Sequence, residues 1–346
     1  MITSRPFGAL SDGTAVTCYR LSVPSGAYVN ILDYGATVQS LVVPDRNGQL
    51  TDVILGYPDA IGYETGTFYF GATVGRHANR IGGGTFTLNG TTYQLDCNSG
   101  PNHSHGGFHG YHQRMFTPEV CGDALEMHLV SPDGDQGYPG NLRLTVRFTF
   151  TPDLALNIDF SAGSDQDTVV NLTNHCYFDL SGGKNPLGQL LWIDADQFTE
   201  NDENTLPTGV IADVAGTPFD FRQPKPLGQD ITADSQQLRN CNGYDHNFVL
   251  KNGGTPKVIA RLSSPDTGII LEETTDLPGV QLYSGNFVDA PNGKRPYGFR
   301  SGVCLEGQFF PNAMAVEEFQ KPILRKGDEY RHVIRYQFKT NKNAQR

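Results

Sequence analysis

The stretch LRLTVRFTFTPDLALNIDF, residues 142–160, decides the fold class of this chain. In its first half, apolar residues from Leu142 to Phe150 alternate with Arg and Thr, as they do in a strand with one buried face. The alternation resumes after Pro152–Asp153, a pair typical of turns. We therefore expect two long strands, over 142–151 and 154–162, that pair antiparallel.

Further strand-like runs separated by turn signals lie on both sides of this stretch. They cover residues 28–35, 37–43, 85–95, 168–180 and 330–338, and the Asn89–Gly90 pair inside the third predicts a hairpin. Helical patterns are few and short: DITADSQQLRN within 223–240 and one turn over 58–64. No repeat, charge block or low-complexity linker marks a boundary. The sequence predicts an all-β fold, one large antiparallel β-sandwich that spans 1–346 as a single domain.

Composition narrows the choice of ligands. The formal net charge of −11 argues against nucleic acids and anionic membranes, which require basic patches. The six cysteines lie far apart, with no C-x-x-C pair, so zinc ribbons and redox dithiols are not expected. The start lacks an apolar signal region, and no run approaches 18 apolar residues. We expect a cytoplasmic protein that binds a small or neutral ligand.

NHSHGGFHGYH, residues 102–112, contains four of the nine histidines. The spacing of His103, His105 and His109 is compatible with a metal site, but such spacing is common by chance. The alternative is a crowded structural loop. Since two glycines follow His105 and allow the backbone to approach a ligand, we expect His105 to point into a pocket.

Two other stretches carry an ionisable residue among apolar ones. His175, in NLTNHCYFDL (171–180), is either a core histidine or a general acid, since imidazole titrates near neutrality. Glu306, in VCLEGQFFPNA (303–313), needs hydrogen-bond donors, an ion pair or a cleft, because an unpaired buried charge is costly. Alternation places Glu306 on the face of Cys304 and Gln308.

Polar groups in three more stretches suit a ligand rich in hydroxyls. Asp245 follows Gly243–Tyr244, where a turn aspartate is the alternative. The others are Asn79 and Arg80 in GRHANRI (75–81), and Gln281 and Asn286 in GVQLYSGNF (279–287). Amides beside a single arginine fit hydroxyls better than phosphates, which draw several basic groups. The G-x-S-x-G, P-loop, Rossmann and H-E-x-x-H patterns are absent from the sequence.

The order of these motifs resembles the aldose 1-epimerase (galactose mutarotase) family. The motifs that carry the resemblance are GRHANRI, PNHSHGG, SPDGDQGYPG, NLTNHCYFDL, GYDHNF, GVQLYSGNF and VCLEGQFFPNA, which span 75–313. YETG (63–66) and the segment 321–338 extend it to nearly the whole chain. The resemblance implies a mutarotase-like supersandwich whose open cleft binds an aldohexose and interconverts its α and β anomers. It implies no cofactor and no metal, and we expect a monomer or a weak homodimer.

The resemblance also implies roles for particular residues. His175 matches the general acid that protonates the ring oxygen, and Glu306 matches the base that removes the C1 hydroxyl proton. The residues that match sugar-holding positions are Asn79, Arg80, His105, Asp245 and Gln281, and Tyr177 is expected to line the same cleft. The chain departs from the family pattern at Ser104, Asp179, Gly307 and Phe116, which leaves the preferred sugar open.

Two other functions remain open from the sequence. Glu306 and Asp245 could act as the carboxylate pair of a glycoside hydrolase. A non-catalytic sugar-binding protein is the second alternative, although a pure binder has no need of an acid–base pair. Mutarotation needs only a base at O1–H and an acid at the ring oxygen, so the rate is expected to be bell-shaped in pH.

Overall fold

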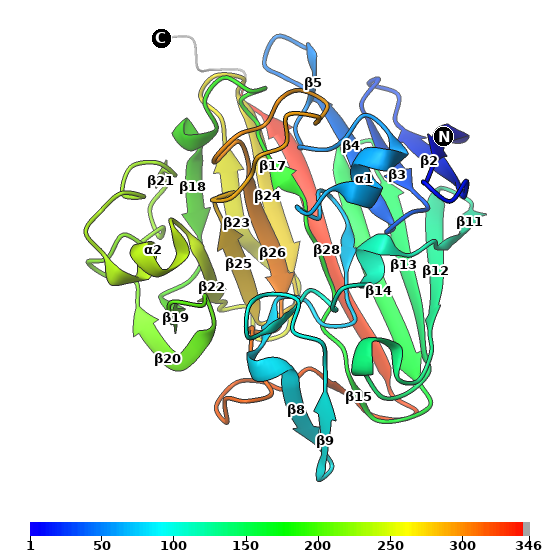
Figure 1. The fold of residues 1–346 in the computed structure, drawn as a ribbon. Helices are drawn as coiled ribbons and strands as arrows, with labels where there is room; N and C mark the ends of the chain where they lie inside the picture. The colour runs from blue at the N-terminus through cyan, green and yellow to red at the C-terminus, as the bar shows by residue number, and fades with distance from the viewer. Residues whose placement is uncertain (342–346) are drawn as a thin grey trace.

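The computed structural model describes residues 1–341, which form mainly antiparallel strands with two short helices (Figure 1). The largest sheet has nine strands, in the spatial order β11 (Thr117–Cys121), β12 (Ala124–Ser131), β13 (Leu142–Phe150), β14 (Ala155–Ser164), β28 (Glu329–Thr340), β24 (Ile269–Thr275), β23 (Lys257–Ser263), β18 (Leu190–Ile193), β21 (Lys225–Pro226). The stretch that predicted the fold forms β13 and β14, which pair antiparallel from Leu142–Ser164 to Phe150–Leu156. That prediction is confirmed.

Two further sheets complete the sandwich. One has six strands, in the order β17 (Tyr177–Phe178), β26 (Val303–Gln308), β25 (Gly279–Tyr283), β22 (Asp245–Val249), β19 (Gln197–Asn201), β20 (Pro207–Asp213). The other has five, in chain order: β1 (Ile2–Ala9), β2 (Ala15–Ser22), β3 (Tyr28–Leu32), β4 (Thr37–Pro44), β5 (Leu50–Asp52). One apolar cluster contains side chains from all three sheets, for example Val29, Leu144 and Val280. The all-β sandwich is therefore confirmed.

Short elements connect these sheets. Four two-stranded pairs are β6 (Thr73–Val74) with β16 (Thr173–Asn174), β7 (Arg80–Ile81) with β10 (His103–Ser104), β8 (Thr85–Leu88) with β9 (Thr91–Gln94), and β15 (Thr168–Val169) with β27 (Ile323–Leu324). The helices are α1 (Ala60–Thr65) and α2 (Gln236–Cys241), and the 3₁₀ turns are η1 (Gly82–Gly84), η2 (Tyr111–Gln113), η3 (Asp135–Gly137) and η4 (Pro186–Gly188). Asn89 and Gly90 form the predicted hairpin turn, both with positive φ.

Two local predictions were wrong. The run 168–180 is not one strand but three pieces, β15, β16 and β17, which pair with three different partners. His175 consequently lies between β16 and β17 rather than inside a strand. The helix expected over DITADSQQLRN covers only Gln236–Cys241, because the preceding residues form turns and Asp230 pairs with Lys225.

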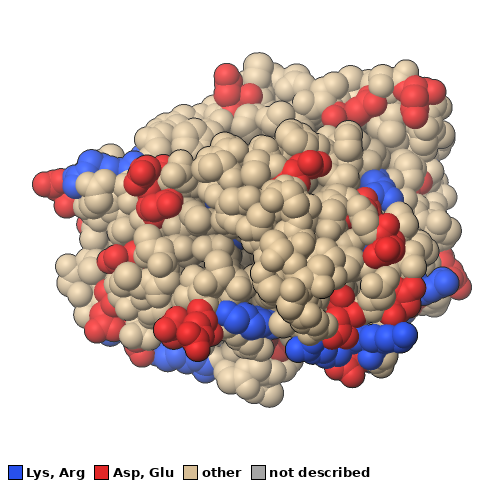
Figure 2. Space-filling model, turned by 60° about the horizontal axis from the view of Figure 1, so that its bottom comes forward, with Lys and Arg blue, Asp and Glu red and all other residues tan. Residues whose placement is uncertain are grey.

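Charged side chains lie mostly around the margin of the face seen in Figure 2, with acidic and basic groups interspersed. Uncharged atoms fill the middle of that face, which is hollowed. Within residues 1–341, no helix has the length and apolar character needed to cross a bilayer.

Candidate active site

A pocket of about 250 Å³ collects most of the residues that the sequence singled out. Its lining residues are Thr67, Phe68, Tyr69, Asn79, Arg80, Asn98, Ser99, Ser104, His105, His175, Tyr177, Asp245, Tyr283, Phe287 and Glu306. The volume lies just below the usual range for ligand sites, roughly 300–1,000 Å³. Seven of the eight proposed site residues line this pocket, and Gln281 does not.

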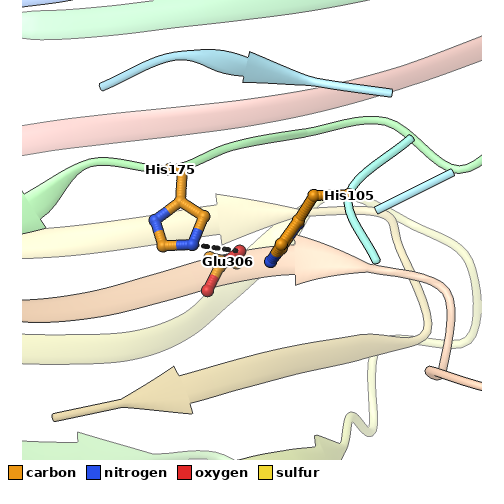
Figure 3. Close-up of side chains that lie close together, drawn as sticks. All are labelled: His105, His175 and Glu306. Carbon is orange, nitrogen blue, oxygen red and sulfur yellow. Dashed lines mark ion pairs between the residues drawn. The ribbon is translucent and has the colours of Figure 1, made fainter. Parts of the chain in front are cut away.

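His175 and Glu306 face each other at this pocket (Figure 3). The His175 Nε2 and Glu306 Oε2 atoms are 3.7 Å apart, close enough for an ion pair but too far for a hydrogen bond. Both side chains are at least 95 % buried, and Glu306 Oε2 has no hydrogen-bond partner among residues 1–341. Since a buried polar atom without a partner is costly, this oxygen is suited to accept a proton or hydrogen bond from a ligand.

Burial moves the pKa values of these two groups in opposite directions. It lowers the pKa of His175 to about 3, and the neighbouring His112 acts in the same direction. Burial raises the pKa of Glu306 well above its usual value, and the charges of Asp245 and Glu273 add to this, while Arg80 opposes it. The neutral form of each group is therefore favoured at these buried positions.

His105 is positioned by Asn79 through two backbone contacts. The Asn79 N–H donates to His105 Nδ1 at 3.2 Å, and the His105 N–H donates to the Asn79 carbonyl at 3.2 Å. Gly106, with φ of 84°, lets this loop pass close to Gly75, because an added Cβ would lie 1.9 Å from the Gly75 carbonyl oxygen. The sequence predicted that the glycines after His105 let the backbone approach a ligand, whereas Gly106 approaches the backbone of Gly75.

The hydrogen bond from the Asn79 N–H to His105 Nδ1 also bears on metal binding. His105, His175 and Glu306 bring three potential ligand atoms within 4.8 Å of one another. However, a Nδ1 that accepts from Asn79 carries no proton, so a neutral His105 holds its proton on Nε2. A metal-binding histidine needs the opposite arrangement, in which the second nitrogen donates to a partner. His105 is therefore better suited to donate to a sugar oxygen than to bind a metal.

Arg80 and Asp245 form the second polar wall of the pocket. Arg80 Nη1 lies 3.5 Å from Asp245 Oδ2, and the Asn79 side chain accepts from the Arg80 backbone at 2.8 Å. Gln281 Nε2 donates to Asp245 Oδ1 at 2.7 Å. Gln308 donates to Gln281 in turn, at 3.3 Å. Gln281 thus orients Asp245 from behind and does not line the cavity.

Four neighbouring strands, β17, β26, β25 and β22, bring these groups together. Gln281 on β25 lies directly opposite Glu306 on β26 and Asn247 on β22, and Asp245 begins β22. Tyr177 on β17 pairs with Cys304, whose sulfur lies 3.6 Å from His175 Nδ1. This register joins residues up to 130 positions apart in the chain, which local patterns do not reveal.

The remaining histidines of the 102–112 stretch have different environments. His103 is fully buried in β10 and contacts the Tyr138 hydroxyl at 2.8 Å. His109 is exposed, and His112 packs against Tyr69 with ring centroids 4.4 Å apart. Neither His103, His109 nor His112 lines the pocket.

Sequence reasoning missed several lining residues, above all Tyr69. Its ring contacts those of His105, His112 and His175, and its φ of 57° is unusual for an aromatic residue. The aromatic run TFYFG contained a weak signal for it. Of the four departures from the family pattern, only Ser104 lines the pocket. Phe116 is buried in the core, Gly307 is buried in β26 beside Glu306, and Asp179 pairs with Arg295.

Comparison with known proteins finds one family along nearly the whole chain. The family model described as aldose 1-epimerase matches residues 17–337. Galactose mutarotase of Bos taurus is 42 % identical over 343 residues, covering 97 % of this chain and 98 % of the relative. Aldose 1-epimerase of Escherichia coli K12 is 36 % identical over 334 residues, with coverage of 94 % and 96 %.

Solved structures show the same architecture. The GalM/aldose epimerase homologue from C. elegans superimposes with a TM-score of 0.86 at 31 % identity and covers 93 % of this chain and 98 % of its own. Galactose 1-epimerase from Lactobacillus acidophilus gives a TM-score of 0.86 at 29 % identity, with 99 % of both chains covered.

Proposed function

Since this chain belongs to the aldose 1-epimerase family, we propose that it interconverts the α and β anomers of free aldohexoses such as D-galactose and D-glucose. The protein is then a cofactor-independent isomerase. The observation that carries the proposal is the buried Glu306 Oε2 without a partner, 3.7 Å from His175 Nε2 at one pocket.

The proposed reaction uses two proton transfers at one carbon. Glu306 removes the proton from O1–H, and His175 gives a proton to the ring oxygen as the C1–O5 bond breaks. O1 and O5 are both bonded to C1, so an acid and a base that lie side by side can serve both. Rotation about C1–C2 then exposes the other face of the aldehyde, and reclosure reverses both transfers. Each positioned group typically contributes about 10²–10⁴-fold.

The other wall of the pocket supplies sugar contacts. Arg80 and His105 offer N–H donors, while Asn79 offers an amide. Asp245 offers a carboxylate whose orientation is fixed by Gln281. Tyr177 contributes an apolar ring beside the acid. We propose that these groups hold the hydroxyls of the sugar while C1 reacts, with Gln281 acting through Asp245.

The glycoside hydrolase alternative is less well supported. That chemistry requires a second carboxyl group free to act as an acid or nucleophile. In this pocket one oxygen of Asp245 accepts from Gln281 and the other faces Arg80. Asp245 is thereby engaged on both sides, while His175 supplies the proton-transfer group that hydrolysis does not need.

Polarimetry of freshly dissolved α-D-galactose and α-D-glucose tests the proposal. We expect micromolar protein to accelerate the change in optical rotation well beyond the buffer rate, and dialysis against a chelator to leave that rate unchanged. No acceleration with either sugar would refute the proposed activity. Release of an aglycone from an aryl glycoside would support the hydrolase, and sugar binding without acceleration would support the non-catalytic binder.

We further propose a cytoplasmic location and a monomer or weak homodimer. All six cysteines are free, and Cys18, Cys176, Cys241 and Cys304 are buried as thiols, as expected in a reducing compartment. Sedimentation velocity over a range of protein concentrations tests the assembly state. A single species that stays larger than a dimer on dilution would contradict it.

A further inference from the structure

The turn over residues 69–72 holds the backbone of the proposed acid. The Gly71 N–H donates to the His175 carbonyl at 2.9 Å, and the His175 N–H donates to the Ala72 carbonyl at 2.9 Å. The turn is closed by the Ala72 N–H, which donates to the Tyr69 carbonyl at 3.0 Å. Tyr69 begins this turn with φ of 57°. The backbone that fixes His175 therefore also fixes Tyr69.

Two tyrosine rings stack against the His175 imidazole. The centroids of Tyr69 and His175 are 5.7 Å apart with planes inclined by 20°, and those of Tyr177 and His175 are 5.0 Å apart with planes inclined by 21°. A cation within about 6 Å of an aromatic centroid is attracted by the π face. An imidazolium at this position would feel that attraction, whereas a neutral imidazole would not.

The other groups around His175 do not supply the same help. Glu306 and Cys304 face it from β26, while His105 and His112 approach from the 102–112 segment. Cys304 offers only a weak thiol contact, and positive charge on either histidine would oppose protonation of His175. Among the described residues, the contacts that favour the cation are Glu306, the hydrogen bond of His175 with its own backbone and the two tyrosine faces.

We propose that Tyr69 is a positioning residue for the general acid, which fixes the plane of the His175 imidazole and favours the imidazolium through its π face. The kinetic consequences of this inference rest on the proposed function. The stacked contact and the shared turn are independent of that function. The positive φ of Tyr69 supports this proposal, because a bulky residue keeps such a backbone conformation only where its surroundings require it.

Four replacements at position 69 separate the ring from the backbone. Tyr69→Phe keeps the ring, Tyr69→Leu removes it, and Tyr69→Asn removes it while tolerating positive φ. Pentafluorophenylalanine keeps the ring shape but reverses the charge distribution of its face. Tyr28→Leu, on β3 away from the pocket, is the matched control, and thermal unfolding reports the stability of each variant.

We expect Tyr69→Phe and Tyr28→Leu to keep kcat within about threefold of the wild type. Tyr69→Leu, Tyr69→Asn and the pentafluorophenylalanine variant should lose about tenfold in kcat with little change in KM, since one pKa unit corresponds to a tenfold change in the protonated fraction. The acid limb of the kcat profile should move to lower pH in these three variants.

The ¹⁵N chemical shifts of the His175 imidazole give a readout that does not need activity. Its titration should move to lower pH in the three impaired variants and stay in place in Tyr69→Phe. The proposal would be overturned if the Phe and pentafluorophenylalanine variants had the same kcat and the same His175 titration. Full activity of Tyr69→Asn would also overturn it. Absence of mutarotation in the wild type would refute the proposed function, while the titrations would still decide the role of Tyr69.

Discussion

At the scale of single residues, the site combines an acid and a base whose pKa values are displaced toward the neutral form. An imidazolium with a lowered pKa gives up its proton readily, and a carboxylate with a raised pKa accepts one readily. The shifts therefore strengthen each group for its proposed step. Their cost is that the reactive combination, ionised Glu306 and protonated His175, is the less populated one. Contacts that favour this combination, such as those of Tyr69, gain importance for that reason.

Removing either proton-transfer group should nearly abolish turnover. We expect Glu306→Gln and His175→Asn each to lower kcat by about 10²–10⁴-fold, the usual contribution of such a group. Both replacements keep a polar side chain of similar size, so folding should be preserved. Polarimetric progress curves measure kcat, and circular dichroism with thermal unfolding checks the fold. Full activity in either folded variant would show that the assigned role is wrong.

The displaced pKa values predict which groups carry protons in the free protein. Because the pKa of His175 is lowered to about 3, its imidazole should be neutral at pH 6. Because the pKa of Glu306 is raised, its carboxyl should remain protonated well above pH 4.5. Imidazole ¹⁵N shifts test the first statement, and a carboxylic C=O infrared band that disappears in Glu306→Gln tests the second. An imidazolium signal from His175 at pH 6 would contradict this order of protonation.

At the scale of elements, the sequence predicted strands best where both partners are neighbours in the chain. The alternation in β13 and β14 and the Asn89–Gly90 turn each specify a local antiparallel pair. The run 168–180 has equally good strand residues but changes partners twice, from β27 to β6 to β26. Its partners lie 100 or more positions away, so local periodicity contains no sign of the interruption at His175.

The site, too, was predicted only as far as local motifs allow. The resemblance identified residues at the pocket because their motifs are local stretches. It did not reveal that Gln281 lies behind Asp245, since that depends on the register of β22 and β25. Tyr69 was missed because its importance comes from contacts with three histidines distant in sequence.

The loop that carries His105 depends on one glycine. Gly106→Ala would place a Cβ 1.9 Å from the Gly75 carbonyl oxygen, so the loop must move and take His105 with it. We expect at least a tenfold loss of kcat/KM and a lower free energy of unfolding than in the wild type. Polarimetry and urea unfolding measure the two effects.

Gly100→Ala is the matched control for this change. Gly100 also has positive φ, 57°, but within residues 1–341 no atom beyond its chain neighbours lies within 4 Å of its added Cβ. This variant should therefore show only the cost of the left-handed backbone, about 1–2 kcal/mol, and keep its activity. Equal activities of Gly106→Ala and Gly100→Ala would show that close approach to Gly75 does not position His105.

At the scale of the whole molecule, buried histidines couple stability to pH. Six histidines have lowered pKa values, in each case chiefly because they are buried: His77, His103, His105, His112, His175 and His246. The unfolded chain would protonate them near pH 6.5. Four carboxyls with raised pKa values act in the opposite direction, namely Asp33, Asp159, Glu273 and Glu306. The histidines are more numerous, so the unfolded state binds more protons as the pH falls below 6.5.

The sign of the pH effect follows from this difference. Stability falls wherever the unfolded state takes up protons that the native state does not, by about 1.4 kcal/mol per pH unit for each such proton. We expect the free energy of unfolding in urea to be highest near pH 7 and to decrease steadily toward pH 5. His246→Asn should remove the contribution of about one proton from this slope, because His246 is fully buried. Since His246 does not line the pocket, the substitution tests stability rather than the site.

The same unfolding curves test the proposal that residues 1–346 form one domain. Fluorescence of the single tryptophan, Trp192 on β18, reports on the nine-stranded sheet, whereas far-ultraviolet circular dichroism reports on all strands. With one apolar cluster reaching into all three larger sheets, both probes should give the same midpoint at each pH. Separate midpoints would contradict the single domain.

Stability that stayed constant or rose between pH 7 and pH 5 would show that the buried histidines are not the groups that control the pH dependence of unfolding.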